Sequence, residues 1–292
     1  MNIAITGATG FIGTILTSYL KRTQGVTIIP LNRPFFYDGM EERLIQTLSN
    51  CEVVINLAGA PISKRWSSRY KRTLYDSRVG VTRKLIHAME QATVKPKLFI
   101  STSAVGYYPS NGRFDESIDA CGEGFLSELA FDWEKEASYC PSEIRLVITR
   151  FGVVLSPKGG ALKRMLQPLR LTRVATILGS GRQVFPWIGI DDLCRAMDFF
   201  IKNDFTHGIY NLVSPVQTTH GELIRKLSKV YGAWLVIKIP AILIRLLLGE
   251  ASSFILEGQE VYPERLIKSG FSFSTPTIEH FLESIRSSNN NQ

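Results

Sequence analysis

The sequence of 292 residues lacks the cysteine pattern of a disulfide-rich or zinc-binding protein. Its cysteines are widely scattered, and no CxxC pair occurs among Cys51, Cys121, Cys140 and Cys194. Four histidines lie on separate segments without the spacing of metal ligands. This pattern argues against a disulfide framework and is typical of a reducing compartment, and we expect no metal site.

Long hydrophobic runs are also absent. The most apolar stretch, residues 239–248, is too short to span a bilayer and contains Pro240 and Arg245. Met1 leads directly into a predicted strand, with no basic segment before it of the kind that opens a signal peptide. We therefore expect a cytoplasmic protein without a membrane span.

Acidic residues are scarce in two segments of this basic chain, whose formal net charge is +8. Residues 64–84 carry eight basic side chains and one acid, and residues 158–182 carry six basic side chains and no acid. Such clusters suit a phosphorylated ligand, nucleic acid or an anionic surface, although solvated basic helix faces look the same. Because few aromatic residues accompany residues 64–84 and no nucleic-acid fold signature appears, we expect no nucleic-acid partner.

Short apolar runs alternate with helical segments through the first half. The predicted strands are residues 3–6, 27–31, 53–57, 98–102 and 146–150, and the helical segments are 12–22, 41–47, 76–91 and 125–138. Strands separated by helices predict βαβ units, and nearly continuous apolar strands indicate a sheet covered on both faces. The predicted fold is α/β, a Rossmann-type doubly wound parallel sheet with a smaller mixed C-terminal substrate lobe.

The domain boundaries follow from a looser pattern after Arg150. A dinucleotide-binding domain is predicted over residues 1–155, completed by about 190–215 through a helix at 191–202 and a strand at 210–213. Residues 156–189 and 216–286 form the predicted lobe, with helices at 220–230, 241–248 and 263–268, and 287–292 a disordered tail. Gly159-Gly160 and "LGSGRQVFPWIG" are interpreted as loops, and Asp191-Asp192 as the cap of the next helix.

Three glycines follow the first predicted strand in "MNIAITGATGFIG". Gly7 permits a tight turn, Gly10 lets backbone N–H groups approach a diphosphate, and Gly13 allows close helix–strand packing. The phosphates would lie at a helix N-terminus, where free N–H groups and the helix dipole favour anions. Because the motif follows a strand and opens a helix, it predicts dinucleotide binding.

The second strand ends in "PLNRP", without the acidic residue that holds the ribose 2′-hydroxyl in NAD sites. Asn32 and Arg33 stand there instead, and a guanidinium suits a 2′-phosphate. The sequence therefore favours NADP(H) over NAD(H), with a solvent-facing Arg33 as the alternative.

Motifs along nearly the whole chain carry a resemblance to a known family. "GATGFIG", "VINLAGAPI", "YDSRV", "STSAVGYY", "GEGFLSELAFDWE", "TRFGVVLSPKGGAL", "GSGRQVFPWIGIDDL" and "IPAILIRLLLGE" occur in the expected order. The chain resembles the atypical extended short-chain dehydrogenases/reductases called nucleoside-diphosphate-sugar epimerase-like, which end in a small domain of their own. Relatives tend to have His in the "PWI-x" step, where this chain has Gly189.

The resemblance implies a set of cofactor-binding residues in addition to Asn32 and Arg33. They are Gly7, Thr9, Gly10, Phe11, Ile12 and Gly13 along the dinucleotide, Leu57, Ala58 and Gly59 at the adenine ribose and diphosphate, Ser101 and Ser103 on the nicotinamide side, and Phe151, Gly152 and Val153 beneath the ring.

Extended members of this class use a Ser or Thr and then a Tyr-x-x-x-Lys pair, which is missing here. Phe125 and Leu129 occupy the corresponding positions, and neither side chain can transfer a proton. Ser103, Tyr107 and Tyr108 are the candidate catalytic residues, with a cation such as Arg182 stabilising a phenolate and Glu123 and Asp132 as available carboxylates. Alternatively, the two tyrosines only pack and form hydrogen bonds.

The predicted lobe supplies Arg182, Gln183 and Trp187 as candidate substrate-binding residues. Arg and Trp together suit a phosphate or carboxylate next to a planar or sugar ring, and packing alone is the alternative for Trp187.

Two functions remain in competition. The first is an NADP(H)-dependent oxidoreductase or epimerase acting on a small, anionic, nucleotide-linked substrate. The second is a catalytically lapsed NADP(H)-binding regulatory protein with a protein partner, linked to cell division as the resemblance implies.

Overall fold

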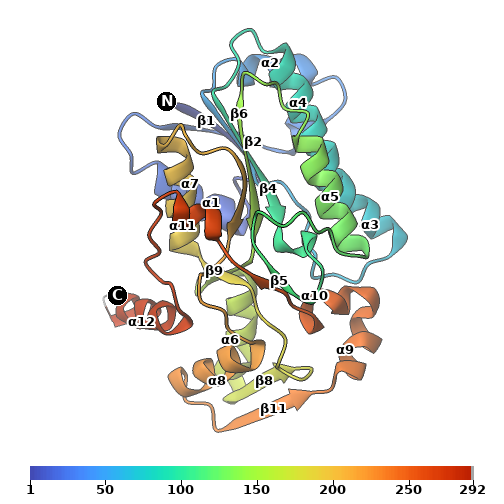
Figure 1. Ribbon diagram of the computed structural model, residues 1–292, viewed down its shortest axis with the longest axis vertical. Coiled ribbons are helices and arrows are strands. Elements are labelled where there is room, and N and C mark those ends of the chain that lie inside the picture. The colour runs from blue at the N-terminus through green and yellow to red at the C-terminus, as the bar shows by residue number, and fades with distance from the viewer. Residues whose placement is uncertain (291–292) are drawn as a thin grey trace.

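A six-stranded parallel sheet forms the centre of the computed structural model, which describes residues 1–290 (Figure 1). The strand order is β10-β6-β4-β3-β1-β2. The strands are β1 (Asn2–Thr6), β2 (Thr27–Leu31), β3 (Val53–Asn56), β4 (Leu98–Ala104), β6 (Arg145–Phe151) and β10 (Gly208–Leu212). The predicted parallel Rossmann-type sheet is confirmed, and each predicted strand of the first half agrees with an observed one within a few residues.

Helices cover both faces of this sheet because successive strand residues point to opposite sides. On one face Ile3, Ile5 and Ile55 pack against α1 (Phe11–Leu20) and α7 (Ile190–Lys202). On the other, Ala4 and Val54 pack against α2 (Glu41–Leu48) and α4 (Val81–Gln91), with α5 (Phe125–Ala137) beside α4. All of these strand side chains are buried, which explains why the strands contain few polar residues.

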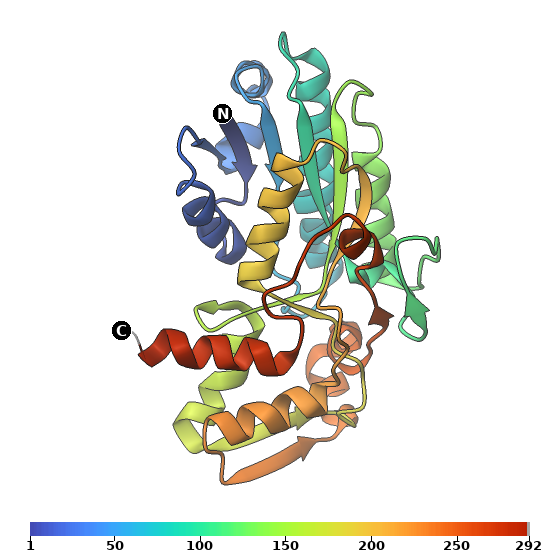
Figure 2. The ribbon, with the colours of Figure 1, turned by 60° about the vertical axis from the view of Figure 1, so that its left-hand side comes forward.

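A smaller lobe lies at one end of the sheet, at the bottom of Figure 1. Its core is formed by α6 (Gly160–Thr172), α8 (His220–Val230) and α12 (Ile278–Asn290), together with β8 (Val174–Leu178), which pairs in parallel with β11 (Leu235–Ile239). Figure 2 shows α8 lying beside this two-stranded sheet. The helix α12 runs through residues 287–290, where the sequence predicted the start of a disordered tail, and residues 291–292 lie outside the described part.

Shorter elements join the two parts. The strands β7 (Val153–Ser156) and β9 (Trp187–Gly189) pair in parallel, as do β5 (Arg113–Phe114) and β12 (Glu260–Val261). A π-helix at Asp76–Gly80 links α3 (Ser68–Tyr75) to α4. The remaining helical segments are η1 (Arg33–Phe36), η3 (Val105–Tyr107), α9 (Ala241–Leu248), η4 (Gly249–Ser252), α10 (Ser253–Leu256) and α11 (Glu264–Lys268).

Two local predictions were wrong and a third was correct in part. Gly160 begins α6 and does not lie in a loop. In "LGSGRQVFPWIG", residues 179–186 form the predicted loop, whereas Leu178 ends β8 and Trp187–Gly189 form β9. Asp192 does not cap α7, whose N-cap is Gly189. Its buried carboxylate instead accepts hydrogen bonds from the backbone N–H groups of Ser274 and Thr275, at 2.7 and 2.8 Å, and so fixes the segment that leads into α12.

Within the described residues, no helix combines the length and apolar character needed to cross a bilayer.

Candidate dinucleotide and active site

The glycine loop between β1 and α1 has a shape that only glycine permits at two positions. Gly7 adopts φ +64°, and a β-carbon there would lie 2.6 Å from the carbonyl oxygen of Leu57. A β-carbon on Gly13 would lie 2.1 Å from the carbonyl oxygen of Gly7, which also accepts a 2.9 Å hydrogen bond from the N–H of Gly10. The loop is therefore folded tightly against both α1 and the segment after β3.

The N-terminus of α1 is open to an anion. Gly10 is its N-cap, no side chain caps it, and its first turn contains no acidic residue. The ring of Phe11 fills the space beside the glycines of the β7–α6 turn, where a β-carbon on Gly159 would lie 2.4 Å from the ring. Free N–H groups at a helix start, with backbone close by on either side, form a cradle suited to a diphosphate.

The ends of β2 and β3 lie at the same edge of the sheet. Leu31 pairs in register with Thr6, so Asn32 and Arg33 begin immediately beside the glycine loop, and both are exposed. After β3, the N–H groups of Leu57 and Ala58 each donate a 3.0 Å hydrogen bond to the hydroxyl oxygen of Thr6. Parallel strands bring these segments together where open α/β sheets bind ligands, at the carboxyl ends of the strands.

The segment after β6 also reaches this edge. Gly152 lies between β6 and β7, and a β-carbon there would be 2.8 Å from both the carbonyl oxygen of Pro186 and a methyl group of Val213. The N–H of Val153 donates a 2.8 Å hydrogen bond to the same Pro186 oxygen. Gly152 thus allows the main chain to pass from the sheet into the lobe.

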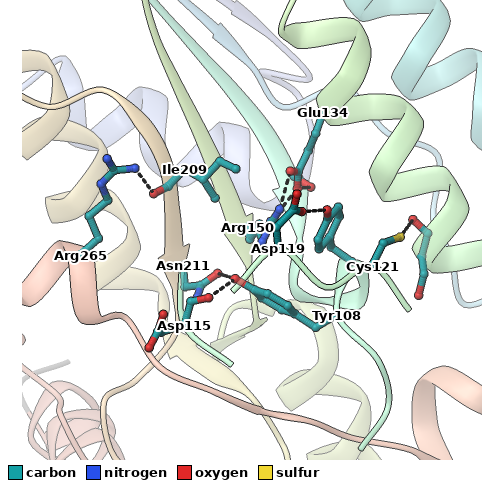
Figure 3. Close-up of polar contacts among 12 residues, drawn as sticks. Tyr108, Asp115, Asp119, Cys121, Glu134, Arg150, Ile209, Asn211 and Arg265 are labelled. Atoms are coloured by element: carbon teal, nitrogen blue, oxygen red, sulfur yellow. Dashed lines mark hydrogen bonds and ion pairs between the residues drawn. The ribbon is translucent and has the colours of Figure 1, made fainter. Parts of the chain in front are cut away.

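Glu134 and Arg150 form a buried ion pair (Figure 3), and Ser103 lies next to it. The hydroxyl of Ser103 donates a 2.6 Å hydrogen bond to Glu134 Oε1, and Arg150 Nε donates to the same oxygen at 2.8 Å. Arg150 Nη2 binds the other carboxylate oxygen at 2.7 Å. The pair is almost fully buried, with side-chain exposures of 3% for Arg150 and 9% for Glu134. Ser101, two residues earlier on β4, has a buried hydroxyl with no partner among the described residues.

Both candidate tyrosines pack against Arg150. Its guanidinium carbon lies 3.6 Å from the ring centroid of Tyr107 and 4.7 Å from that of Tyr108. The Tyr107 hydroxyl donates to Asp119 at 2.6 Å, and the Tyr108 hydroxyl donates to the carbonyl oxygen of Asp115 at 3.0 Å. Burial is the main cause that raises the pKa of each phenol, so both are protonated at neutral pH. In this arrangement neither tyrosine is a ready base.

The positions of the missing Tyr-x-x-x-Lys pair are apolar. Phe125 and Leu129 lie one turn apart on α5 and face an apolar cluster with Trp66, whose ring centroid is 5.4 Å from that of Phe125. The ammonium of Lys71 lies 4.8 Å from the Phe125 ring and is paired with Glu250. Neither position of the pair provides a proton donor.

The three candidate substrate residues of the lobe do not converge on one point. Trp187 is 1% exposed and packs against Phe281 with ring centroids 5.4 Å apart. The amide of Gln183 donates to the carbonyl oxygen of Leu178 at 2.9 Å. Arg182 is exposed. Trp187 thus has a packing role in this structure, whereas the side chain of Arg182 is accessible to a ligand.

The sequence analysis did not identify Glu134 and Arg150 as site residues. It named Glu123, which is exposed, and Asp132 as the available carboxylates. A signal for Glu134 existed: it shares a helix face with the buried residues Ala130 and Ala137. A carboxylate on a buried helix face requires a partner.

Comparisons with known proteins find relatives along nearly the whole chain. The profile of the NAD dependent epimerase/dehydratase family matches residues 3–212, and that of a domain of unknown function, DUF1731, matches residues 239–285. An epimerase family protein of Staphylococcus epidermidis is 35% identical, with 96% of this chain and 97% of that protein covered. A related epimerase family protein of Staphylococcus aureus is also 35% identical over the same shares of the two chains.

Solved structures show the same fold. The crystal structure of the human epimerase family protein SDR39U1 (isoform 2) with NADPH has a TM-score of 0.87 at 31% identity, covering 98% of this chain and 99% of that one. The nucleoside-diphosphate sugar epimerase from Corynebacterium glutamicum has a TM-score of 0.74 at 25% identity, covering 97% of this chain and 57% of that one.

Proposed function

Since this chain belongs to the NAD dependent epimerase/dehydratase family, as an atypical extended short-chain dehydrogenase/reductase, we propose that it binds NADP(H) and acts as an oxidoreductase or epimerase on a small anionic, nucleotide-linked substrate. The glycine loop carries the proposal. Its backbone is folded so tightly that a β-carbon on Gly7 or Gly13 would collide with a carbonyl oxygen, and it lies beside an uncapped helix N-terminus. These features fit a dinucleotide diphosphate.

The preference for NADP(H) rests on Arg33. It is exposed at the end of β2, next to the glycine loop, and forms no ion pair with the carboxylates that the structure describes. Its guanidinium is thus available to a 2′-phosphate, to which it can donate two parallel hydrogen bonds. The NADPH in the human relative supports this preference.

Binding of NADPH and NADH to the Arg33→Ala variant tests the preference. Loss of charge-assisted hydrogen bonds worth about 1.5–3 kcal/mol corresponds to roughly a 10- to 150-fold higher Kd for NADPH. We expect the Kd for NADH to change little. Arg286→Ala is the matched control, because Arg286 is an exposed arginine on α12 in the other lobe. Equal losses for NADPH and NADH would contradict the assignment of Arg33.

The chemistry available at the nicotinamide end distinguishes an enzyme from a regulatory protein that binds NADP(H) without turnover. A bound nicotinamide supplies or accepts a hydride, and Ser103 presents its oxygen while donating its proton to Glu134. We infer that this oxygen orients a substrate by accepting a hydrogen bond from one of its hydroxyl groups. The basic residues of positions 158–182 support an anionic substrate.

A specific observation favours the alternative, a regulatory protein that binds NADP(H) without turnover. The apolar Phe125 and Leu129 and the hydrogen-bonded Tyr107 leave the expected place of the acid–base pair without a free proton donor. NADPH carrying deuterium at either face of C4, mixed with the protein and a cell extract, separates the two functions. Protein-dependent label in one metabolite supports an oxidoreductase. Confirmed NADPH binding with no label from either face, and no epimerisation in a sugar-nucleotide assay, supports the regulatory function.

A further inference from the structure

Arg78 is half-buried, whereas the other arginines of the basic segment 64–84 are exposed. Lys71, Arg83 and Lys84 of this segment form ion pairs with acidic residues. Arg78, in the π-helix between α3 and α4, forms none with the carboxylates that the structure describes. Its charge is therefore not neutralised by the protein.

The guanidinium of Arg78 is nevertheless withdrawn from solvent and held in place. Its Nη2 donates to the carbonyl oxygen of Ala60 at 3.0 Å and its Nη1 to that of Leu74 at 3.3 Å, and the ring of Trp133 lies 5.5 Å away. Burial lowers the pKa of Arg78 to about 10. A cation held in this way is costly to bury unless an anion or further acceptors meet it.

Part of the guanidinium has no partner. An arginine has five N–H donors, and among the residues described here neither Nε nor one of the two Nη2 hydrogens of Arg78 has an acceptor. The acceptors that exist, the carbonyl oxygens of Leu74 and Ala60 and the hydroxyl of Ser77, occupy Nη1 and one hydrogen of Nη2. The free donors are therefore available to a ligand.

The surroundings of Arg78 place it beside the dinucleotide cradle. A β-carbon on Gly59 would lie 3.1 Å from the guanidinium carbon, so the glycine lets the cation lie directly against the segment after β3. Two residues earlier in that segment, the Leu57 carbonyl oxygen closes the cradle, 2.6 Å from where a β-carbon of Gly7 would be. The absence of a side chain at Gly59 thus allows Arg78 to lie close to the segment that borders the cradle.

We propose that Arg78 binds the part of the dinucleotide beyond its first phosphate, through the oxygens of the second phosphate or of the second ribose. The inference rests on the proposed cofactor binding and adds a second cation to the site. Arg33 and Arg78 act at different ends of the ligand, since Arg33 follows β2 and Arg78 lies against the segment after β3. The planar fork of an arginine is suited to phosphate oxygens, and ribose hydroxyls also accept its hydrogen bonds.

Calorimetric titration with three ligands tests this assignment on the full chain. They are NADPH, 2′-phospho-ADP-ribose, which lacks the nicotinamide, and 2′,5′-ADP, which ends at the first phosphate. For Arg78→Met we expect a 10- to 100-fold higher Kd for NADPH and 2′-phospho-ADP-ribose, with at most a twofold change for 2′,5′-ADP. Arg78→Lys should retain part of the affinity. Arg72→Met, an exposed arginine of the same segment, should bind all three like the wild type.

The outcomes separate this inference from the proposed function. Wild type that binds none of the ligands overturns both. Wild type that binds all three, with Arg78→Met unchanged for NADPH, overturns the role of Arg78 alone. An equal loss for all three ligands in Arg78→Met also overturns it, because Arg78 would then only support the fold of the segment after β3. Retained 2′,5′-ADP binding in Arg78→Met shows that the variant is folded.

Discussion

Removal of the charge of Glu134 should lower the free energy of unfolding, by an amount that follows from the burial of its partner Arg150. In Glu134→Gln the amide still accepts the hydrogen bond from Ser103, but an amide nitrogen takes the place of one oxygen that Arg150 binds. Arg150 is left as a cation whose side chain is 3% exposed. Breaking a buried ion pair from one side costs about 3–5 kcal/mol, and we expect the free energy of unfolding to fall by that amount.

The same helix provides a matched control. Glu136 pairs with Arg83, whose side chain is 63% exposed, so Glu136→Gln removes a pair that water already screens. We expect it to cost about 0.2–1 kcal/mol. The two variants differ in position by two residues and make the same chemical change. Because the two carboxylates are similarly exposed, at 9% and 11%, their difference isolates the burial of the arginine partner, which is 3% exposed for Arg150 and 63% for Arg83.

Urea unfolding followed by circular dichroism measures both variants. A double-mutant cycle with Arg150→Met measures the interaction free energy between Glu134 and Arg150. We expect the double variant to lose about 2–3 kcal/mol less unfolding free energy than the sum of the losses in the two single variants. Equal destabilisation in Glu134→Gln and Glu136→Gln, or a coupling near zero, would refute the reasoning that Glu134 and Arg150 depend on each other.

Two further predictions concern stability and the glycine loop. Burial lowers the pKa of His220 to about 4 from 6.5, so stability is full above pH 6.5 and falls by roughly 3 kcal/mol as the pH drops to 4. Unfolding at several pH values should show that His220→Phe loses this component, whereas the exposed His207→Gln keeps it. Gly13→Ala places a β-carbon 2.1 Å from the Gly7 carbonyl oxygen and should abolish NADPH binding in a fluorescence titration. Gly80→Ala, with 3.9 Å to its nearest neighbour, should bind normally; binding by Gly13→Ala would contradict the tight loop.

Several local sequence patterns were sufficient to predict the fold. The strand runs of the first half and the glycine spacing after β1 depend on neighbours in the chain, through alternation, turn geometry and helix starts. The strand β11 was not predicted, although Leu235, Val236 and Ile237 form an apolar run typical of a strand, and its partner β8 is 61 positions earlier along the chain. Pairing across that separation was decided by tertiary packing.

The polar residues of the site likewise divide into those that could be placed from the sequence and those that only the folded structure brings together. Glycines at 7, 10 and 13 and the arginine after β2 could be placed from the sequence because a local turn brings them to one edge of the sheet. The ion pair of Glu134 with Arg150 could not, because it forms only when α5 packs beside β4 and β6. Asp192 likewise holds backbone 82 residues later, although its position beside a helix start is typical of a cap.

The sequence by itself determined the family, through motifs that resemble it along nearly the whole chain, and the parallel sheet and the glycine loop, through periodicity and glycine spacing. Tertiary structure decided which charges are neutralised and which are free. Arg150 meets Glu134, while Arg78 lies against Gly59 with no carboxylate paired to it in the described residues. Arg150 stands in an apolar strand and Arg78 in a polar segment of the sequence, and only the folded arrangement of α4, α5 and the sheet shows which of the two charges is neutralised.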